Sequence, residues 1–246
     1  MLNGRPPRTP LSISVFFPCY NEEANVENTT HAALTALRRI SDDFEVIIVN
    51  DGSHDRTREI ADRLADQHPE VRAIHNPTNY GYGGALQAGF RGATKTWVFY
   101  TDGDGQFDFD EIEKLLPLLD EFDIVSAYRL NRHDSMIRKF NARGWTTLVN
   151  LVLGMRLRDI DCAFKIFPRR LFDEIDMKSR GALIDAEILA RATQIGCKIG
   201  QVGVHHFPRT AGEQSGANLR VILRAFKELL ALARDIRNTP QRNSSA

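Results

Sequence analysis

The segment VFYTDGDGQFD (98–108) holds the residues with the clearest chemistry. Asp102 and Asp104 stand two positions apart directly after an apolar run, and Gln106 follows at the same spacing. Carboxylates this close repel one another unless a positive charge lies among them. Hard oxygen ligands suit Mg²⁺ or Mn²⁺, which share ligands with a substrate phosphate. The spacing therefore predicts a divalent metal site at Asp102 and Asp104, to which Gln106 can add a neutral oxygen.

Asp108, the last acid of this segment, is interpreted differently. An aspartate just before a helical pattern is a typical helix cap, and we expect that role for it. The acids also fit the first positions of an EF-hand loop. However, Phe107 stands where that loop requires glycine, and an apolar strand replaces the entering helix. An EF-hand is therefore rejected.

The cluster YGYGGAL (80–86) partly matches the dinucleotide-binding pattern G-x-G-x-x-G. Its sixth position is Leu86, and it follows the third predicted strand, so the match is weak. The pattern indicates a glycine-rich turn that opens a helix, and such a turn could still approach a nucleotide.

Short apolar stretches alternate with amphipathic ones along the chain. The stretches predicted as strands are 12–17, 44–50, 71–76, 96–101, 122–128 and 198–207. Helical patterns cover 22–40, 51–67 after an initial turn, 83–94 and 108–120. This alternation predicts an α/β fold, with a doubly wound and mostly parallel central sheet flanked by helices.

Polar clusters follow the first four predicted strands. They read PCYNEE, DGSHD, NPTNYGYGG and DGDGQ. Asp, Asn and Gly also form ordinary turns, but ligands of such sheets bind outside the carboxyl ends of the strands. The recurrence of these clusters on one rim predicts a shared ligand site.

The composition limits the classes of protein. With 32 basic and 32 acidic residues the charges balance, which argues against a nucleic-acid-binding protein. A chain of 246 residues that is 42% hydrophobic can bury one substantial core. We predict a single domain over 12–237, with disordered ends at 1–11 and 238–246.

The cysteines and the apolar runs indicate the compartment. Cys19, Cys162 and Cys197 form no CxxC pair or disulfide framework, which favours a reducing cytoplasm. The N-terminus lacks the apolar core of a signal peptide, and no run of about 18 apolar residues could span a bilayer.

Several segments, taken in order, resemble family 2 glycosyltransferases with the GT-A fold. The segments are FFPCYNEEANVE, IIVNDGSHDRT, NYGYGGALQAG, TDGDGQFD, AYR, RDIDCAFKIFPRRLF and VGVHHFPRTAGEQSG, which together span roughly residues 12–216. The resemblance is to the branch of dolichyl-phosphate mannose synthases and polyprenyl-phosphate glycosyltransferases. It implies a Rossmann-like sheet and sugar transfer from a nucleotide-diphosphate donor.

The resemblance also implies roles for single residues. Asp102 and Asp104 match the D-x-D motif that holds Mg²⁺ or Mn²⁺ against the donor diphosphate, with Gln106 at a third metal-contacting position. The implied substrate contacts are these two acids with Pro18, Tyr20, Glu22, Asp51, Gly83, Gly103, Arg129, Lys165, Arg209 and Ser215.

Asp159, Asp161 and Asp185 are the candidate catalytic acids by family position. A lipid monophosphate is already anionic at neutral pH, so the site does not require a strongly tuned base. Each of these acids could instead cap a helix or pair with Arg158 or Lys165. His205 and His206 point to opposite faces of a strand, which favours structural roles over joint metal binding.

Three departures from the family pattern stand out. Asn50 stands where the family often has a second aspartate, so a different nucleotide recognition is expected. The late R-x-x-G-x-S-K motif appears as RTAGEQS without its lysine. The C-terminal membrane spans of some relatives have no counterpart here.

Residues 129–158 carry basic residues around the apolar run WTTLVNLVLGM, a pattern typical of membrane-interface helices. A helix packed on the sheet with a solvated basic rim is the alternative. The amphipathic segment 219–237 favours core packing or an oligomer contact. A cytoplasmic protein bound peripherally to the membrane follows, with a membrane-protein partner or a homo-oligomer possible.

The favoured function is that of an inverting, metal-dependent transferase that moves a hexose, of the mannose or glucose type, to a polyprenyl or dolichyl phosphate. The alternatives are a related enzyme with a soluble saccharide or protein acceptor, and a non-catalytic nucleotide-sugar-binding subunit. The intact Asp102 and Asp104 pair argues against the last.

Overall fold

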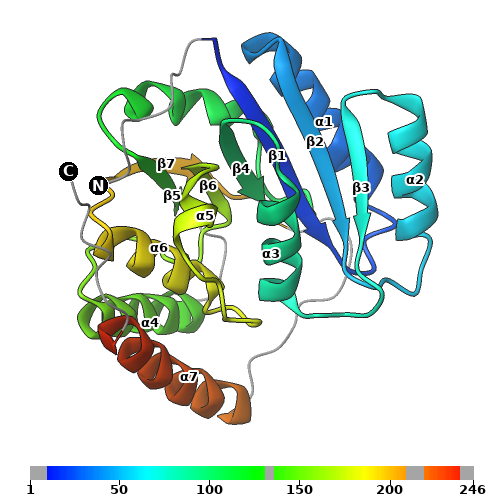
Figure 1. Ribbon diagram of the computed structural model, residues 1–246. Coiled ribbons are helices and arrows are strands. Elements are labelled where there is room, and N and C mark those ends of the chain that lie inside the picture. Colours follow the sequence, from blue (N-terminus) through cyan, green and yellow to red (C-terminus); the bar gives the residue numbers. More distant parts are fainter. Residues whose placement is uncertain (1–9, 131–135, 209–218, 239–246) are drawn as a thin grey trace.

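The structure, a computed structural model, describes residues 10–130, 136–208 and 219–238. Its centre is a seven-stranded sheet in the order β3-β2-β1-β4-β6-β5-β7 (Figure 1). The strands are β1 (Ser12–Cys19), β2 (Asp43–Asn50), β3 (Val71–His75), β4 (Trp97–Thr101), β5 (Ile124–Leu130), β6 (Phe164–Pro168) and β7 (Ile199–His205). The predicted α/β fold is confirmed.

The sheet is mostly parallel. β1 pairs in parallel with β2 and β4, β2 with β3, and β5 with β7, whereas β6 runs antiparallel to both β4 and β5. The carboxyl ends of β1, β2, β3 and β4 therefore meet on one rim, where the sequence places its acidic and glycine-rich loops.

Helices cover both faces of the sheet. They are α1 (Val26–Ile40), α2 (Thr57–Gln67), α3 (Tyr82–Gly92), α4 (Met136–Leu153), α5 (Leu171–Glu174), α6 (Ile184–Gln194) and α7 (Leu219–Asn238). In Figure 1, α3 lies in front of β1 and β2 and α1 behind them, while α4, α6 and α7 gather at the lower left.

An aromatic cluster fixes α3 on the sheet. The ring of Phe90 on α3 lies 4.8 Å from that of Phe16, 5.5 Å from that of Tyr100 and 5.6 Å from that of Phe167 between centroids. All four side chains are buried, and each brings a large apolar area to the contact. This packing holds the last turn of α3 against β1, β4 and β6.

Two predicted elements differ in the structure. The helix predicted over 108–120 is a pair of 3₁₀ helices, η1 (Phe109–Lys114) and η2 (Leu116–Asp120), and Pro117 at the start of η2 prevents a continuous α-helix. Asp108 caps η1 by accepting the amide of Asp110, as predicted. The helix predicted from residue 22 begins at Val26, because the residues before it form the loop after β1.

β6 was not predicted at all. Its five residues read FKIFP and are all buried, but a lysine in the second position is not expected in a buried strand.

At the termini, Leu11 is buried and its carbonyl accepts the Ser41 hydroxyl, so the folded part begins before the predicted residue 12. The prediction of a disordered tail falls on residues 239–246, which lie outside the described residues, except that Asn238 still belongs to α7.

Candidate active site

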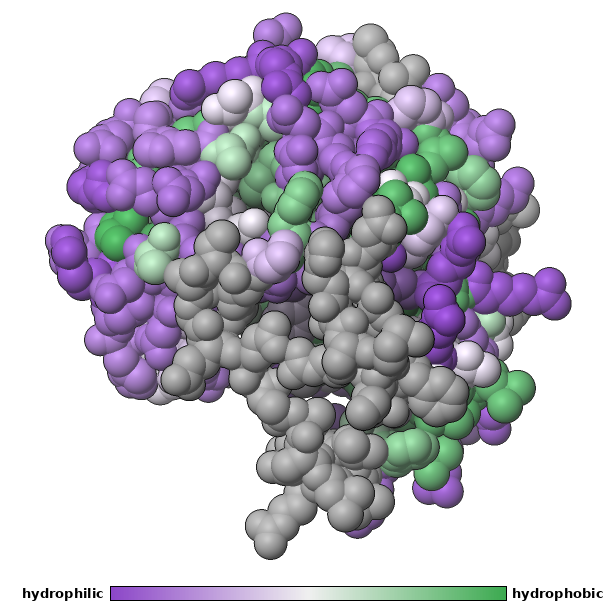
Figure 2. Space-filling model, turned by 180° about the vertical axis from the view of Figure 1, so that it is seen from behind, coloured by the Kyte–Doolittle hydropathy of each residue, from purple (hydrophilic) through white to green (hydrophobic). Residues whose placement is uncertain are grey.

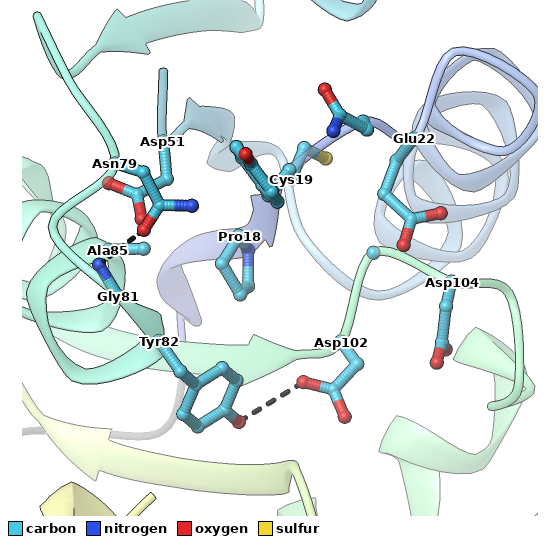
Figure 3. Close-up of a pocket in the computed structure, with 13 residues that line it drawn as sticks. Pro18, Cys19, Glu22, Asp51, Asn79, Gly81, Tyr82, Ala85, Asp102 and Asp104 are labelled. Atoms are coloured by element: carbon cyan, nitrogen blue, oxygen red, sulfur yellow. Dashed lines mark hydrogen bonds between the residues drawn. The ribbon is translucent and has the colours of Figure 1, made fainter. Parts of the chain in front are cut away.

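A cavity of about 740 Å³ opens at the carboxyl ends of β1, β2 and β4, beside the first turn of α3 (Figure 3). Most of the side chains that line it come from the loops that follow these strands. They are Pro18, Cys19, Tyr20, Asn21, Glu22, Asp51, Asn79, Gly81, Tyr82, Ala85, Asp102, Gly103 and Asp104. The volume is that of a typical ligand site.

Hydrogen bonds join the loop after β1 to the loop after β2. Asn21 adopts a left-handed conformation with φ of 55°, and its side-chain oxygen accepts the His54 amide at 2.8 Å. Its own amide donates to the Ser53 hydroxyl at 3.0 Å, and the Glu22 amide donates to Thr57 Oγ1 at 2.9 Å. These reciprocal bonds fix the first wall of the cavity.

Asp51 ties the loop after β3 to the same wall. Its Oδ1 accepts from Asn76 Nδ2 at 2.6 Å and from the Tyr80 amide at 3.0 Å. The side chain is only 3% exposed although it lines the cavity. Asp51 therefore organises the rim, whatever it contacts in a bound ligand.

Asp102 and Asp104 form the acidic side of the cavity. Gly103 between them has no room for a side chain, because a Cβ there would lie 2.7 Å from the Pro18 carbonyl oxygen and 2.9 Å from Cys19 Sγ. Close approach of the two loops thus requires glycine, and it brings both acids to the cavity.

The electrostatics show excess negative charge at these acids. Burial, with the neighbouring Asp104 carboxylate next in weight, raises the pKa of Asp102 to about 7. Tyr82 donates a hydrogen bond to Asp102 Oδ1 at 3.1 Å. Burial and the Asp102 charge raise the pKa of Tyr82, so the phenol keeps the proton that it donates.

The donor set fits a hard divalent cation. Two carboxylates line one cavity, and the negative charge of Asp104 helps to raise the pKa of Asp102, an environment that suits Mg²⁺ or Mn²⁺ shared with a phosphate. Within the described residues, no three His, Cys, Asp or Glu side chains form a complete metal cage. Ligand oxygens from a bound substrate would have to complete the coordination.

A second polar cluster lies between β4, β6 and α6. Lys165 is fully buried, and its ammonium group donates to Asp185 Oδ1 at 2.7 Å, to the Tyr100 hydroxyl at 3.0 Å and to the Cys162 carbonyl at 2.5 Å. Three acceptors satisfy all three N–H bonds of the ammonium group. Lys165 and Asp185 therefore neutralise one another.

Arg129 and Asp159 form the third part of the site. Arg129 Nε donates to Asp159 Oδ2 at 2.7 Å and Nη2 to Oδ1 at 2.8 Å, a bidentate ion pair. Burial opposes the charge on Arg129, but the pair with Asp159 outweighs it and raises the pKa of Arg129. Near this pair, burial and then the Asp185 and Asp159 charges raise the pKa of Asp161 to about 6.

The structure thus separates the predicted site residues into groups. Pro18, Tyr20, Glu22, Asp51, Asp102, Gly103 and Asp104 line the cavity together. A second group, in the polar clusters described above, consists of Arg129, Asp159, Asp161, Lys165 and Asp185. Of these, Asp185 raises and Arg129 lowers the pKa of Asp102 through their charges. Arg209 and Ser215 lie outside the described residues.

Two predicted residues are placed away from the cavity. Gln106 donates its side-chain amide to the Phe207 carbonyl at 2.8 Å, which ties the acidic loop to the end of β7. The Gly83 amide donates to the Arg180 carbonyl at 2.9 Å, so this glycine packs against a neighbouring loop. His205 bonds Glu111 and His206 packs on Phe107, in agreement with the structural roles expected for them.

Tyr82, Tyr100 and Asn79 were not singled out from the sequence. Tyr82 stands between the glycines of the turn at 80–86, a position that could have drawn attention to it. The contact with Asp102 becomes visible only when α3 is folded against the end of β4.

Comparisons with known proteins agree with this geometry. Residues 14–176 match the family model Glycosyl transferase family 2. The chain therefore belongs to glycosyltransferase family 2.

Two relatives are similar in sequence. Glycosyltransferase AglD of Haloferax volcanii is 34% identical over 209 residues, which cover 81% of this chain and 34% of AglD. Undecaprenyl-phosphate 4-deoxy-4-formamido-L-arabinose transferase of Salmonella choleraesuis is 30% identical over 217 residues, which cover 85% of this chain and 64% of that protein. The chain thus spans about a third to under two thirds of these relatives.

Among solved structures, glucosyl-3-phosphoglycerate synthase from Mycobacterium tuberculosis has a similar fold. Its complex with Mn²⁺, UDP and glucosyl-3-phosphoglycerate superposes with a TM-score of 0.68 at 18% identity, over 94% of this chain and 81% of that one. At this identity the likeness shows the fold, that of a GT-A glycosyltransferase.

Proposed function

We propose that the protein moves a hexose, of the mannose or glucose type, from a nucleotide-diphosphate sugar to a polyprenyl phosphate, with inversion at the anomeric carbon. The observation that carries the proposal is the pair Asp102 and Asp104, held at a cavity on the carboxyl rim of the sheet. The undecaprenyl phosphate in the name of the Salmonella relative supports the acceptor class.

The donor occupies the cavity. Pro18, Tyr20 and Glu22 contact the nucleoside from one side, and Asp51 holds the opposite loop in place. Asp102 and Asp104 would hold Mg²⁺ or Mn²⁺ against the diphosphate. When bound, the cation neutralises the charge that develops on the leaving nucleoside diphosphate.

The acceptor lies on the side of Arg129. Its guanidinium attracts the lipid phosphate, and Asp159 orients the guanidinium through the bidentate pair. A phosphate oxygen then attacks the anomeric carbon, and the bond from that carbon to the diphosphate oxygen breaks. Asp161, whose pKa is about 6, can take up a proton from the acceptor where one remains. The Lys165 and Asp185 pair contributes to the electrostatic field around Asp161.

A membrane-facing surface accompanies this acceptor. Within the described residues, no helix is long and apolar enough to cross a membrane. However, α4 and α7 expose Leu151 (81%), Phe226 (41%) and Leu230 (54%), and Phe226 packs on Trp145 at 5.8 Å between ring centroids. Figure 2 shows apolar residues at the lower right, where α4 and α7 lie. We propose that this apolar surface rests on the lipid surface from which the acceptor enters.

Transfer assays test the function directly. The protein is incubated with radiolabelled GDP-mannose, GDP-glucose, UDP-glucose or UDP-galactose and a short polyprenyl phosphate, and the product is extracted into organic solvent. Label should enter the organic phase with one of the donors. The matched control is the same polyprenol without its phosphate, which should accept nothing. Transfer to 3-phosphoglycerate or a soluble saccharide, with none to the lipid phosphate, would contradict the acceptor class.

Sedimentation with vesicles tests the surface. Leu151→Glu and Phe226→Glu should lower binding to anionic vesicles, because each places a charge where an apolar side chain met the lipid. Gln67→Glu on α2, at the far end of the molecule, adds the same charge as a control (Figure 1). Equal binding of all three variants would remove the apolar surface from the proposal.

A further inference from the structure

Tyr82 has a contact that the family pattern does not account for. Its hydroxyl donates to Asp102 Oδ1 at 3.1 Å. In Figure 3 the second oxygen of Asp102 points away from the phenol, in the same general direction as the Asp104 carboxylate. The hydrogen bond therefore occupies one oxygen of the acid and leaves the other for a ligand.

The backbone on both sides of Tyr82 is held by its neighbours. Gly81 has φ of +80°, and a Cβ on it would lie 2.8 Å from the Arg180 carbonyl oxygen. The Gly83 amide donates to that same carbonyl at 2.9 Å, and a Cβ on Gly83 would lie 2.5 Å from the Ser179 carbonyl oxygen. Only glycines allow this close approach, and it fixes the position of the backbone at Tyr82, the first residue of α3.

The loop that holds Tyr82 is itself anchored by a buried acid. Glu187 on α6 is 0% exposed and accepts the backbone amides of Lys178 at 3.1 Å and Ser179 at 2.6 Å. Arg191 pairs with Glu187 at 2.9 Å and balances its charge. The backbone at Tyr82 is thus held by contacts that lie outside the cavity.

We propose that Tyr82 is a positioning residue that holds Asp102 as a one-oxygen ligand and so sets which divalent cation the site prefers. The inference rests on the proposed function, in which Asp102 and Asp104 hold a cation against a nucleoside diphosphate. Mg²⁺ demands near-octahedral geometry at short distances, whereas Ca²⁺ accepts two oxygens of one carboxylate. An acid whose second oxygen is engaged favours the smaller cations.

The test measures metal binding and needs no turnover. Mn²⁺ is titrated into the protein in the presence of saturating UDP or GDP and followed by electron paramagnetic resonance, and Ca²⁺ is then used as a competitor. Tyr82→Phe removes the hydroxyl and keeps the ring. Tyr128→Phe removes a hydroxyl from a tyrosine outside the cavity, whose ring contacts Arg158, and serves as the matched control.

Tyr82→Phe should weaken Mn²⁺ binding by about tenfold or more, the usual effect of removing the partner of a metal ligand. Ca²⁺ binding should change less, so that the preference for Mn²⁺ over Ca²⁺ falls, while the melting temperature and the Tyr128→Phe protein stay unchanged. A general loosening of the site would weaken both cations alike.

Three results would overturn the inference in distinguishable ways. Equal Mn²⁺ and Ca²⁺ affinities in the wild type and Tyr82→Phe would remove the role of Tyr82 and leave the proposed metal site intact. A wild-type protein that binds Ca²⁺ as tightly as Mn²⁺ would contradict one-oxygen binding without any variant. A wild-type protein that binds no Mn²⁺ with either nucleotide would overturn the proposed metal site itself.

Discussion

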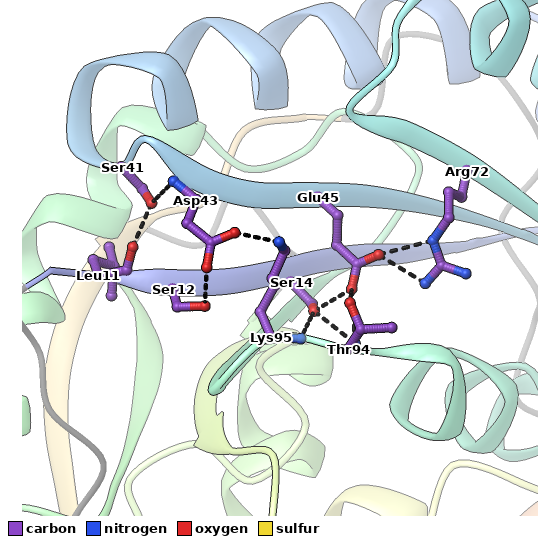
Figure 4. A network of polar contacts seen from close by, with 9 residues as sticks. All are labelled: Leu11, Ser12, Ser14, Ser41, Asp43, Glu45, Arg72, Thr94 and Lys95. Carbon is purple, nitrogen blue, oxygen red and sulfur yellow. Dashed lines mark hydrogen bonds and ion pairs between the residues drawn. The ribbon is translucent and has the colours of Figure 1, made fainter.

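The amino ends and the carboxyl ends of β1, β2 and β4 both carry carboxylates, but the surroundings of these acids differ. At the amino ends, Glu45 accepts the Ser14 hydroxyl at 2.6 Å and both the amide and the hydroxyl of Thr94 at 2.7 Å, and it pairs with Arg72 at 2.7 Å (Figure 4). At the carboxyl rim, the Asp102 carboxylate faces a cavity beside a second carboxylate.

The pKa values express this difference. Burial opposes the charge on Glu45, but the hydrogen bonds from Ser14 and Thr94 outweigh it and lower its pKa. At Asp102 burial is reinforced by Asp104, and the pKa rises to about 7. A carboxylate that accepts several hydrogen bonds and an ion pair stabilises the fold. Two adjacent carboxylates at a cavity instead provide negative charge that a cationic or metal-bound ligand can neutralise.

The largest effect should come from Asp104→Asn, which removes one acid from the carboxyl rim. Transfer should fall about 10²–10³-fold, the range seen when a group that stabilises developing charge is lost. The free energy of unfolding should stay the same or rise, because one of two repelling carboxylates is gone. Initial rates and urea unfolding of the same preparations measure both. A fall in the free energy of unfolding that is large enough to explain the lost activity by unfolding would contradict the comparison.

Glu45→Ala should act in the reverse sense at the amino ends. It leaves buried donors of Ser14 and Thr94 without an acceptor, which costs about 3 kcal/mol of unfolding free energy. Activity per folded molecule should be retained, because the strand ends lie on the side opposite the cavity. Urea unfolding, combined with donor binding at low temperature, separates the two quantities. Unchanged stability would show that the network is not what holds this end.

The pH dependence of stability should have opposite signs for the two acids. The folded pKa of Asp102, about 7, lies above the value near 4 of an unfolded chain. Its contribution to stability is therefore full below pH 4 and is lost as pH rises through 7. The contribution of Glu45, whose pKa is lowered, is present above its unfolded pKa near 4 and is lost as pH falls below it.

Urea unfolding between pH 4.5 and 8 checks the Asp102 half of this prediction. The ligand-free wild type should lose stability with rising pH relative to Asp102→Asn. The difference isolates Asp102 from Asp161, whose raised pKa acts in the same direction. Parallel pH profiles of the two proteins would contradict the raised pKa.

The smallest effect should come from Lys95→Met, in the outer part of the amino-end network. Lys95 pairs with Asp43, whose side chain is 55% exposed, so water and salt screen the pair. The free energy of unfolding should change by at most about 0.5 kcal/mol. A loss similar to that of Glu45→Ala would mean that the network acts as one unit, and thermal or urea unfolding distinguishes the two.

Much of the carboxyl rim could be predicted from the sequence, and little of the amino-end network. The strand-end loops were visible because apolar strands alternate with helices, so acids after β1, β2 and β4 had to meet on one rim. Glu45 is a single acid inside the apolar stretch FEVIIVN, and its partners come from β1, β3 and the loop before β4. Only the folded sheet brings these segments together.

The same reasoning explains why β6 and Tyr82 were missed. The lysine of FKIFP is compatible with a buried strand only because Asp185 on α6, 20 residues further along the chain, supplies a counter-charge. The Tyr82 contact depends on the packing of α3 and on a loop after β6. Local patterns carry no information about partners of this kind, whereas the D-x-D spacing is itself local.

Calorimetric titration of a nucleoside diphosphate tests the central claim most directly. UDP and GDP are titrated into the wild type with Mn²⁺ and then with a chelator, at neutral pH. One of the two nucleotides should bind at least about tenfold more tightly with Mn²⁺, and Asp104→Asn should abolish that difference. Equal affinity in chelator and in Mn²⁺ for the wild type would contradict a cation-assisted donor site on the carboxyl rim.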